Sequence, residues 1–277
     1  MATNVFIFVP AFGQQLSAAT VMTVQNVQQA FMAKGIGGGF SSLSFPDIAE
    51  LRSMVLTMWY DAMPMSSHLL FIDADMGFAP TLPLDMLLFD HPLVGALYPQ
   101  RKVPLSWAGS GTGKPVADRR GDFMKVEGTG MGCTLIRRDC VDAIIANEER
   151  ARERRIDSII SEDANALRDA GAYDLTRRII ARSFPPFIDY RMEMHPGKEL
   201  MATVGAKRII RAFDGLDIPA RGRVSEDLSF CIRAGDAGVP CWAAIGHRIS
   251  HVGMYDYGAC YLESIAAPQP TLTTAKW

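Results

Sequence analysis

The sequence lacks long hydrophobic runs, paired cysteines and, in its first 100 positions, basic residues. No apolar stretch of the 277-residue chain reaches the roughly 18–20 residues that cross a bilayer, so we expect no transmembrane segment. The opening residues MATNVFIFVPAFG lack the basic start and the cleavage site of a signal peptide, which favours a first strand. The five cysteines include no C-x-x-C pair, which argues against structural zinc and a disulfide framework and favours a reducing cytoplasm.

The charge balance excludes binding to nucleic acid by overall charge. The chain has 28 basic and 30 acidic residues and a net charge of −2, so it is no polycation. Only Lys34 and Arg52 are basic among the first 100 residues, against seven acidic residues. The front of the chain is therefore acidic, and the remainder holds the other 26 of the 28 basic residues.

Hydrophobic patterns predict an α/β fold. We expect strands at residues 5–9, 68–72, 93–98 and 240–244, and helices at residues 14–34, 48–63, 84–89, 139–155 and 226–235. Strands that alternate with helices indicate βαβ units and a mixed, mostly parallel central sheet flanked by helices. Ligands of such sheets bind at the carboxyl ends of the strands.

Other segments have weaker patterns. Residues 35–40 suggest a loop or the start of a weak strand, residues 99–125 a long loop or hairpin, and residues 247–258 a polar, aromatic loop. Residues 150–182 are charged and helical and look inserted relative to a minimal α/β core. The tail at 267–277 looks weakly structured.

Two carboxylates directly follow a predicted strand in the segment FIDADMGF. Asp73 and Asp75 at such a position are costly unless something cationic satisfies them. Mg²⁺ or Mn²⁺ does so well, because both prefer carboxylate oxygens and commonly also hold substrate phosphate. The alternative is a simple turn in which the aspartates close the strand.

A second acidic pair opens a predicted helix in the segment SEDLSFCIR. Glu226 and Asp227 follow the capping residue Ser225, and both the cap and the helix dipole favour acids there, which is a sufficient structural explanation. The functional interpretation is a general base, in which one carboxylate faces a cleft and deprotonates an incoming hydroxyl.

Two further motifs have a functional and a structural interpretation. His251, in the segment SHVG, could supply an imidazole nitrogen to a divalent ion, although a lone histidine usually does not. The run Gly128-Thr-Gly-Met-Gly132 is neither a P-loop nor a dinucleotide fingerprint. Its glycines would allow a ligand close to the backbone, or would form a tight turn before a strand.

In their order, the segments FIDADMGF, VGALYPQRK, EGTGMGCTLIRR, SEDLSFCIRAGDAG and SHVG resemble GT-A-fold glycosyltransferases. They are most similar to the small bacterial and phage-type enzymes akin to glycosyltransferase family 2. The resemblance covers roughly residues 3–140 and 183–258. It implies one Rossmann-like GT-A domain at 1–266, with a nucleotide-sugar-binding half at 1–100, an acceptor and catalytic half at 101–266, and a helical insertion at about 141–182.

The resemblance also implies site residues. The positions that match donor-binding residues are Pro10, Ala11, Phe12, Arg52, Asp73, Asp75, Gly128, Thr129 and Gly130. Asp75, Asp73 and His251 match the ligands of Mn²⁺ or Mg²⁺ in the family. Asp227, beside Glu226, matches the aspartate that is the base in inverting enzymes. A nearby cation such as Lys102 would assist the leaving diphosphate.

The predicted reaction is metal-dependent transfer of a sugar from a nucleotide-sugar, with a UDP-sugar favoured, to an acceptor hydroxyl with inversion. A nucleotidyltransferase is one alternative, although residues 10–34 hold only Lys34 where that class has a basic glycine-rich loop. A non-catalytic metal-dependent nucleotide-sugar-binding module is another, and the retention of both acidic motifs argues against it.

Basic residues are concentrated at 101–155. This segment holds twelve basic and eight acidic residues. A solvated helix face is one explanation. The other is a polyanionic acceptor, such as DNA with hydroxymethylated pyrimidines, whose binding would weaken steeply with salt. Glycans, lipid-linked sugars and proteins are further acceptor classes that the sequence leaves open.

Overall fold

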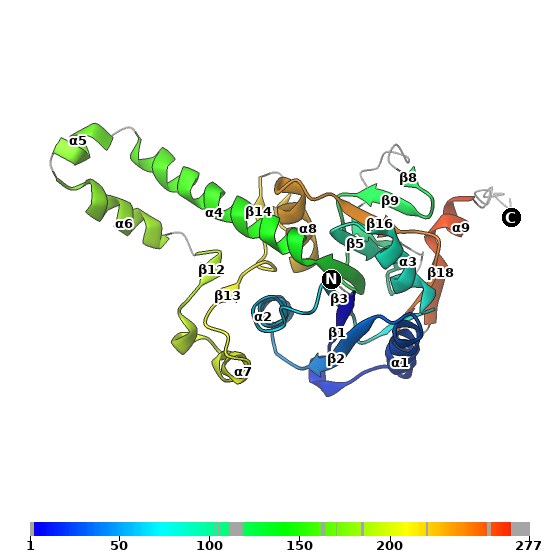
Figure 1. Ribbon diagram of the computed structural model, residues 1–277. Coiled ribbons are helices and arrows are strands. Elements are labelled where there is room, and N and C mark those ends of the chain that lie inside the picture. The colour runs from blue at the N-terminus through cyan, green and yellow to red at the C-terminus, as the bar shows by residue number, and fades with distance from the viewer. Residues whose placement is uncertain are drawn as a thin grey trace, which may run out of the picture.

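A mixed eight-stranded sheet is the centre of the computed structural model (Figure 1). The structure describes residues 3–102, 104, 106–110, 119–161, 164–169, 171–183, 186–219, 221–253 and 256–266. In spatial order, the strands of this sheet are β2 (Gly37–Leu43), β1 (Asn4–Pro10), β3 (His68–Ile72), β11 (Cys133–Arg137), β5 (Leu93–Ala96), β16 (Cys241–Ala244), β9 (Phe123–Val126) and β8 (Arg119–Arg120).

Most strands of this sheet share one direction. β2, β1 and β3 pair in parallel, as do β5 and β16, whereas β11 and β9 run against their neighbours. This confirms the expected α/β class with a mixed, mostly parallel sheet. The arrangement agrees with the Rossmann-like GT-A fold that the resemblance implies.

Helices cover both faces of the sheet. The α-helices are α1 (Ala18–Ala33), α2 (Ile48–Ala62), α3 (Thr81–Phe89), α4 (Arg138–Ile160), α5 (Ala164–Asp169), α6 (Tyr173–Ser183), α7 (Lys198–Thr203), α8 (Glu226–Asp236) and α9 (Tyr261–Ala266). Short 3-10 turns lie at Phe12–Gln14 and Met192–Met194. Across the described segments, no helix combines the length and the apolar character needed to span a membrane.

Alternating side chains divide the core between the two faces of the sheet. On one face Ile7 of β1 packs in a cluster with Val27 of α1. On the other face Phe8 and Phe71 meet edge to face, with ring centroids 6.1 Å apart, in a cluster that includes Leu56 of α2. Each such fully buried side chain contributes about 1.5–3 kcal/mol. The same alternation fixes the register of β1 and β3, which therefore end at one edge of the sheet.

Capping side chains set the starts of the helices near this edge. Oγ of Ser17 accepts a hydrogen bond from the backbone N of Thr20 at 3.0 Å, so α1 begins at Ala18 and not at the expected residue 14. Asp47 caps α2 in the same way, by accepting from the backbone N of Glu50 at 3.0 Å.

The described residues also form smaller sheets beside the central one. They consist of β18 (Asp256–Cys260), β17 (Arg248–Val252) and β4 (Met76–Phe78); of β10 (Gly128–Thr129), β7 (Trp107–Ser110) and β6 (Tyr98–Pro99); and of β12 (Ile188–Asp189) with β13 (Ile209–Ile210). A further pair joins β14 (Asp217–Ile218) to β15 (Gly222–Arg223). The expected strand at 93–98 is therefore divided between β5 and β6.

The prediction of a loop at 247–258 is wrong. β17 and β18 form an antiparallel hairpin, and β17 also pairs with β4. The segment escapes a strand prediction because its polar and aromatic residues do not alternate regularly. Part of its strand pairing is made with β4, which is distant in the sequence.

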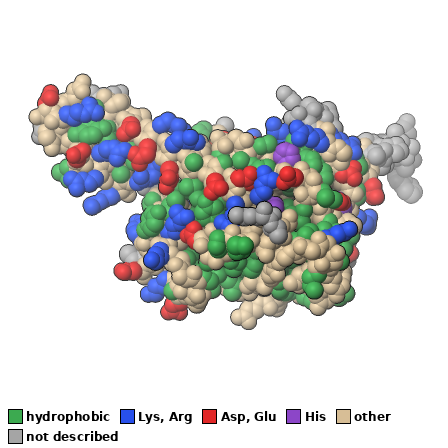
Figure 2. All heavy atoms as spheres, in the orientation of Figure 1, with side chains coloured by type: hydrophobic (Ala, Val, Ile, Leu, Met, Phe, Trp, Pro, Cys, Tyr) green, Lys and Arg blue, Asp and Glu red, His purple; other side chains and the backbone are tan. Residues whose placement is uncertain are grey.

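The helical insertion projects from the body of the protein (Figure 1). The first turns of α4 are anchored in the core through Cys140, Val141 and Ile144, while α6 packs beside the distal part of α4. Figure 2 shows basic side chains interspersed with acidic ones over this projection. Arg177 pairs there with Glu153 and, at 3.6 Å, with Asp157, which favours the solvated-face explanation for these charges. The expected weak tail at 267–277 lies outside the described residues.

Residues 37–43 form a full strand despite their three glycines. β2 pairs in parallel with the whole of β1. Gly38 has a φ of +151°, and a Cβ atom at this position would overlap the carbonyl oxygen of Val5. Glycine is thus needed at 38 so that β2 can approach β1.

We expect Gly38→Ala to lower the free energy of unfolding by at least about 2 kcal/mol, because the new methyl group forces β2 away from β1. Urea denaturation followed by circular dichroism measures the change. Gly39→Ala is the matched control, since its Cβ would have its nearest neighbour, Cδ2 of Phe6, at 3.8 Å. Equal losses in the two variants would contradict the steric explanation.

Candidate active site

A cavity of about 750 Å³ lies at the edge of the sheet where β1 and β3 end. Its volume is within the range of small-molecule sites, roughly 300–1,000 Å³. The residues from the predicted site that line it are Pro10, Phe12, Arg52, Asp73, Asp75 and His251. We call this space the main cavity.

Arg52 of α2 holds three carboxylates together at one wall of the main cavity. Its side chain is only 3% exposed. Nη2 donates a hydrogen bond to Oδ1 of Asp73 at 2.7 Å, and Nη1 donates to Oε1 of Glu226 at 2.8 Å and to Oδ1 of Asp227. One guanidinium therefore joins the loop after β3 to the first turn of α8.

Asp227 is fixed by its own helix and by the loop before β11. The expected cap is present, because Oγ of Ser225 accepts a hydrogen bond from the backbone N of Leu228 at 3.4 Å and α8 begins at Glu226. Oδ2 of Asp227 accepts a hydrogen bond from the backbone N of Met131 at 3.2 Å. With Oδ1 on Arg52, both carboxylate oxygens have defined partners.

Burial raises the pKa of Asp227 to about 7. The positive charge of Arg52 lowers this pKa, but the negative charges of Glu226 and Asp73 act in the same direction as burial. Burial also lowers the pKa of Arg52, and the three carboxylates outweigh it, so that the net pKa is raised and the guanidinium stays charged. A carboxyl group with a pKa near neutrality is suited to general base catalysis.

The pairing of β17 with β4 brings His251 beside Asp75. His251 is opposite Met76 in this register, and the backbone N of Val252 donates to the carbonyl oxygen of Asp75 at 2.7 Å. Nε2 of His251 is 3.3 Å from Oδ2 of Asp75, while Nδ1 donates to the carbonyl oxygen of Pro99 at 2.9 Å. Because Nδ1 carries the donated proton, Nε2 of the neutral ring can accept a proton or bind a metal ion.

Arg101 completes this group from the segment after β6. Its Nη1 is 3.0 Å from Oδ2 of Asp75, and its side chain is 52% exposed. Burial raises the pKa of Asp75, but the hydrogen bond to His251 and the charge of Arg101 outweigh burial and lower the net pKa. Burial lowers the pKa of His251, and the bonds to Asp75 and Pro99 raise it above its usual value.

The predicted metal ligands are only partly brought together. Asp75 and His251 converge, whereas Asp73 is directed to Arg52. In the described parts of the chain, no three or more His, Cys, Asp or Glu side chains are grouped as metal ligands. A carboxylate and an imidazole still fit Mg²⁺ or Mn²⁺, which usually takes its other ligands from substrate phosphates and water.

The glycine run packs against protein atoms. A Cβ at Gly130 would overlap the hydroxyl of Tyr98, and one at Gly128 would lie 2.9 Å from Cβ of Cys231 on α8. The Tyr98 hydroxyl also accepts a hydrogen bond from the backbone N of Gly132 at 3.2 Å. Close packing on Tyr98 and α8 therefore accounts for these glycines without a ligand.

A second cavity, of about 310 Å³, is lined by Asp227, which does not line the main cavity. We call it the small cavity, and its lining includes Tyr98, Gln100, Gly128, Thr129, Gly130 and Ser225. Arg52 lines the main cavity and is paired with Asp227, so the Arg52–Asp227 ion pair connects the walls of the two cavities.

Two of the predicted donor-binding residues line neither cavity. Ala11 is buried, at 4% exposure. Lys102 is exposed, and its neighbour Arg101 lines the main cavity instead. Sequence reasoning missed Arg101 and Tyr98 as site residues, although both are in the segment VGALYPQRK that the resemblance singles out.

Comparison with known proteins gives only distant similarity. No family model and no curated protein matches the chain. The crystal structure of A197 from STIV is similar over 91% of this chain and 86% of that chain, with 14% identity and a TM-score of 0.44. The crystal structure of a glycosyltransferase involved in the glycosylation of the major capsid of PBCV-1 is similar over 50% of this chain and 62% of that chain, with 11% identity and a TM-score of 0.30.

We expect Arg52→Met to destabilise the protein by about 3 kcal/mol or more at pH 7, because it leaves three carboxylates without their counter-charge. Without Arg52 the pKa of Asp227 rises further, so protonation relieves the repulsion and the loss becomes smaller as the pH falls below 7. Urea denaturation at pH 7 and pH 5 measures both effects.

The control for this prediction is Arg208→Met. Arg208 pairs with Asp61 at 2.8 Å, and both side chains are 24% exposed. An ion pair near the surface is worth about 0–1 kcal/mol. A loss in Arg52→Met that matches the control, or that does not depend on pH, would contradict the account.

Proposed function

We propose that the protein is a glycosyltransferase that moves a sugar from a nucleotide-sugar donor to an acceptor hydroxyl with inversion. The observation that carries the proposal is Asp227, a carboxyl group with a pKa near 7 that lines the small cavity and is held by Arg52 of the main cavity. The similarity of the sequence motifs to family 2 glycosyltransferases supports the same function.

The main cavity has the features that a nucleotide diphosphate needs. Phe12 is 81% exposed beside Pro10, Phe45 and Ile48, and such a surface can stack a nucleotide base. Arg101 supplies a guanidinium for the diphosphate. We propose a UDP-sugar as the donor, with the base against Phe12 and the diphosphate toward Asp75 and Arg101.

Asp75 and His251 would hold a divalent cation together with the donor diphosphate. When bound, Mn²⁺ or Mg²⁺ supplies Lewis-acid stabilisation of the charge that develops on the leaving diphosphate. Nδ1 of His251 is fixed by the Pro99 carbonyl, which orients Nε2 toward Asp75.

Asp227 would take the proton of the acceptor hydroxyl as this oxygen attacks the anomeric carbon. The bond from the anomeric carbon to the diphosphate oxygen breaks, and the nucleoside diphosphate leaves with that electron pair. We propose a saccharide hydroxyl as the acceptor, because the lining of the small cavity includes the polar side chains of Tyr98, Gln100 and Ser225 and its volume has room for one sugar unit. A salt-sensitive shift of hydroxymethylated DNA in a binding assay would favour a DNA acceptor instead.

We expect Asp227→Asn to lower the turnover of a nucleotide-sugar by about a hundred-fold or more and to leave donor binding nearly unchanged. In the wild type the rate rises with pH through an apparent pKa near 7, because the carboxylate is the active form. Release of nucleoside diphosphate measures turnover, after a thermal-shift screen of UDP-, GDP- and other nucleotide-sugars with Mn²⁺ has identified the donor.

Asp236→Asn is the matched control, since Asp236 is exposed at the far end of the same helix. It should keep normal turnover. Near-normal turnover in Asp227→Asn would show that another group is the base.

We expect His251→Gln to weaken the affinity for Mn²⁺ in the presence of a nucleoside diphosphate by at least about ten-fold, because one of the two protein ligands is lost. Isothermal titration calorimetry measures the affinity, and removal of the metal with EDTA should abolish turnover. His247→Gln is the control, because His247 forms a similar pair with Asp85 at 3.2 Å but does not line the main cavity. An identical Mn²⁺ affinity in both variants would contradict the assignment of His251.

A further inference from the structure

A third cavity, of about 390 Å³, lies among α4, α8 and the chain from 186 to 217, and it shares no lining residue with the main or the small cavity. We call it the arginine cavity, because Arg152, Arg155, Arg211 and Arg233 line it. Glu148, Asp214 and Asp217 are its acidic lining residues, so four guanidinium groups face three carboxylates.

Three of these arginines have unused hydrogen-bond donors. The Nε atoms of Arg152, Arg211 and Arg233 are buried without a hydrogen-bond partner. The Arg233 side chain is only 7% exposed, and the nearest charged atom to its Nε is Oε1 of Glu148 at 3.6 Å, too far for a hydrogen bond. Buried donors are normally satisfied, so unpartnered Nε atoms on three arginines that line one cavity are unusual.

Backbone carbonyl groups hold two of these guanidinium groups in place. Nη1 of Arg233 donates to the carbonyl oxygens of Ala212 at 3.1 Å and Asp214 at 2.6 Å. Nη2 of Arg152 donates to the carbonyl oxygen of Ala181 at 2.9 Å.

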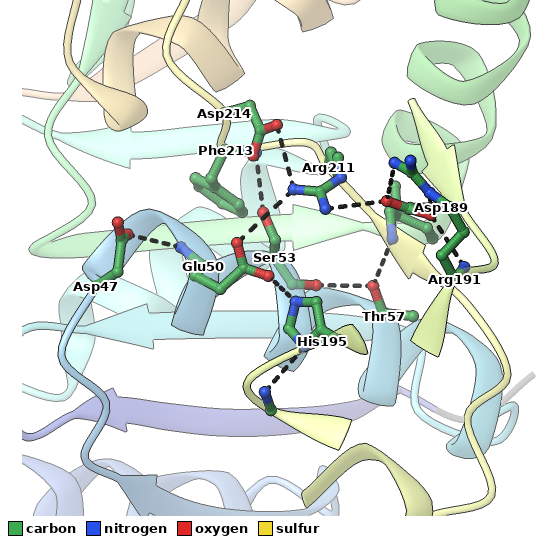
Figure 3. Close-up of polar contacts among 12 residues, drawn as sticks. Asp47, Glu50, Ser53, Thr57, Asp189, Arg191, His195, Arg211, Phe213 and Asp214 are labelled. Carbon is green, nitrogen blue, oxygen red and sulfur yellow. Dashed lines mark hydrogen bonds and ion pairs between the residues drawn. The ribbon is translucent and has the colours of Figure 1, made fainter. Parts of the chain in front are cut away.

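Arg211 is held in the same way by carboxylates. Figure 3 shows it between Asp189, Asp214 and Glu50, with its Nη2 donating to Oδ2 of Asp189 at 3.1 Å. Its ion pairs through Nη1 to Asp214 and Glu50 are longer, at 3.6 and 3.8 Å. The positive groups are therefore preorganised, which lowers the cost of binding an anion.

We propose that the arginine cavity is a binding site for a phosphate group carried by a small molecule. Guanidinium groups match the oxygens of phosphate and carboxylate, and four lining arginines suit the double negative charge of a phosphate better than the single charge of a carboxylate. The volume of the cavity limits the ligand to a small molecule. This site is independent of the proposed glycosyl transfer.

Isothermal titration calorimetry of the full chain with inorganic phosphate, in buffer of matched ionic strength with chloride, tests the proposal. We expect saturable binding that Arg152→Gln weakens about ten-fold or more. Arg154→Gln is the matched control, because Arg154 is exposed on the same helix and does not line the cavity. Equal weakening in both variants, or no saturable binding by the wild type, would overturn the proposal.

Arg101→Gln separates this site from the main cavity, where a phosphate could also bind. The Arg101→Gln variant should still bind phosphate. If Arg101→Gln loses phosphate binding and Arg152→Gln keeps it, phosphate binds in the main cavity and the proposal is refuted. Titration with glycerol 3-phosphate distinguishes a phosphate ester from free phosphate as the ligand. Tighter binding than that of inorganic phosphate indicates a phosphate ester as the ligand, and weaker binding indicates free phosphate.

Amide hydrogen exchange of the wild-type protein tests the location without any variant. Phosphate should slow exchange in the segments 148–155 and 211–217, which contain most of the residues that line the arginine cavity. Protection confined to the loops of the main cavity would contradict the assignment.

Discussion

The arrangement of the candidate site depends on the burial of Arg52 against three carboxylates. Asp73, Glu226 and Asp227 come from two distant segments and would repel one another without a shared cation. The guanidinium has a fork of donors that can hold carboxylates on two sides at once, which a lysine could not do. Burial, together with the negative charges of Glu226 and Asp73, raises the pKa of Asp227 to about 7 despite the positive charge of Arg52, which suits this carboxyl group to proton transfer.

The fold supplies the positions that this network needs. β1 and β3 end at the same edge of the sheet because both cores fix their register, and α2 presents Arg52 toward that edge. The capping of α8 by Ser225 sets Asp227 in the first helical turn, where Met131 also holds it. β17 supplies His251 through its pairing with β4. The end of β3, the capped start of α8 and the pairing of β17 with β4 therefore bring the two acidic motifs and the histidine to one region.

Local patterns in the sequence were sufficient for much of the fold. The strand at 68–72 and the helices after Asp47 and Ser225 follow from apolar spacing and capping residues. Contacts between distant segments were not predictable in this way. The hairpin containing His251 depends on a partner strand far away in the chain, and the strand at 37–43 depends on glycines that permit close approach to β1.

In the candidate site, too, local patterns predicted some residues, and contacts between distant segments determined the rest. Asp73, Asp75, Asp227 and His251 stood out because charged or polar groups follow predicted strands or begin a predicted helix. The pairing of Asp73 with Arg52, and not with a metal site, is a property of the three-dimensional arrangement that spacing does not encode. Tyr98 has no local signal, since its contact with the glycine run joins segments that are separated in the sequence.

The central claim is that the Arg52-centred site catalyses glycosyl transfer with inversion. Proton NMR of an α-linked nucleotide-sugar incubated with the protein, Mn²⁺ and a saccharide acceptor tests this claim most directly, because it reports both the bond that breaks and the configuration of the product. The account predicts release of a nucleoside diphosphate and a product with the β configuration. Release of a nucleoside monophosphate or pyrophosphate, retention of the α configuration, or a donor that stays intact would contradict it.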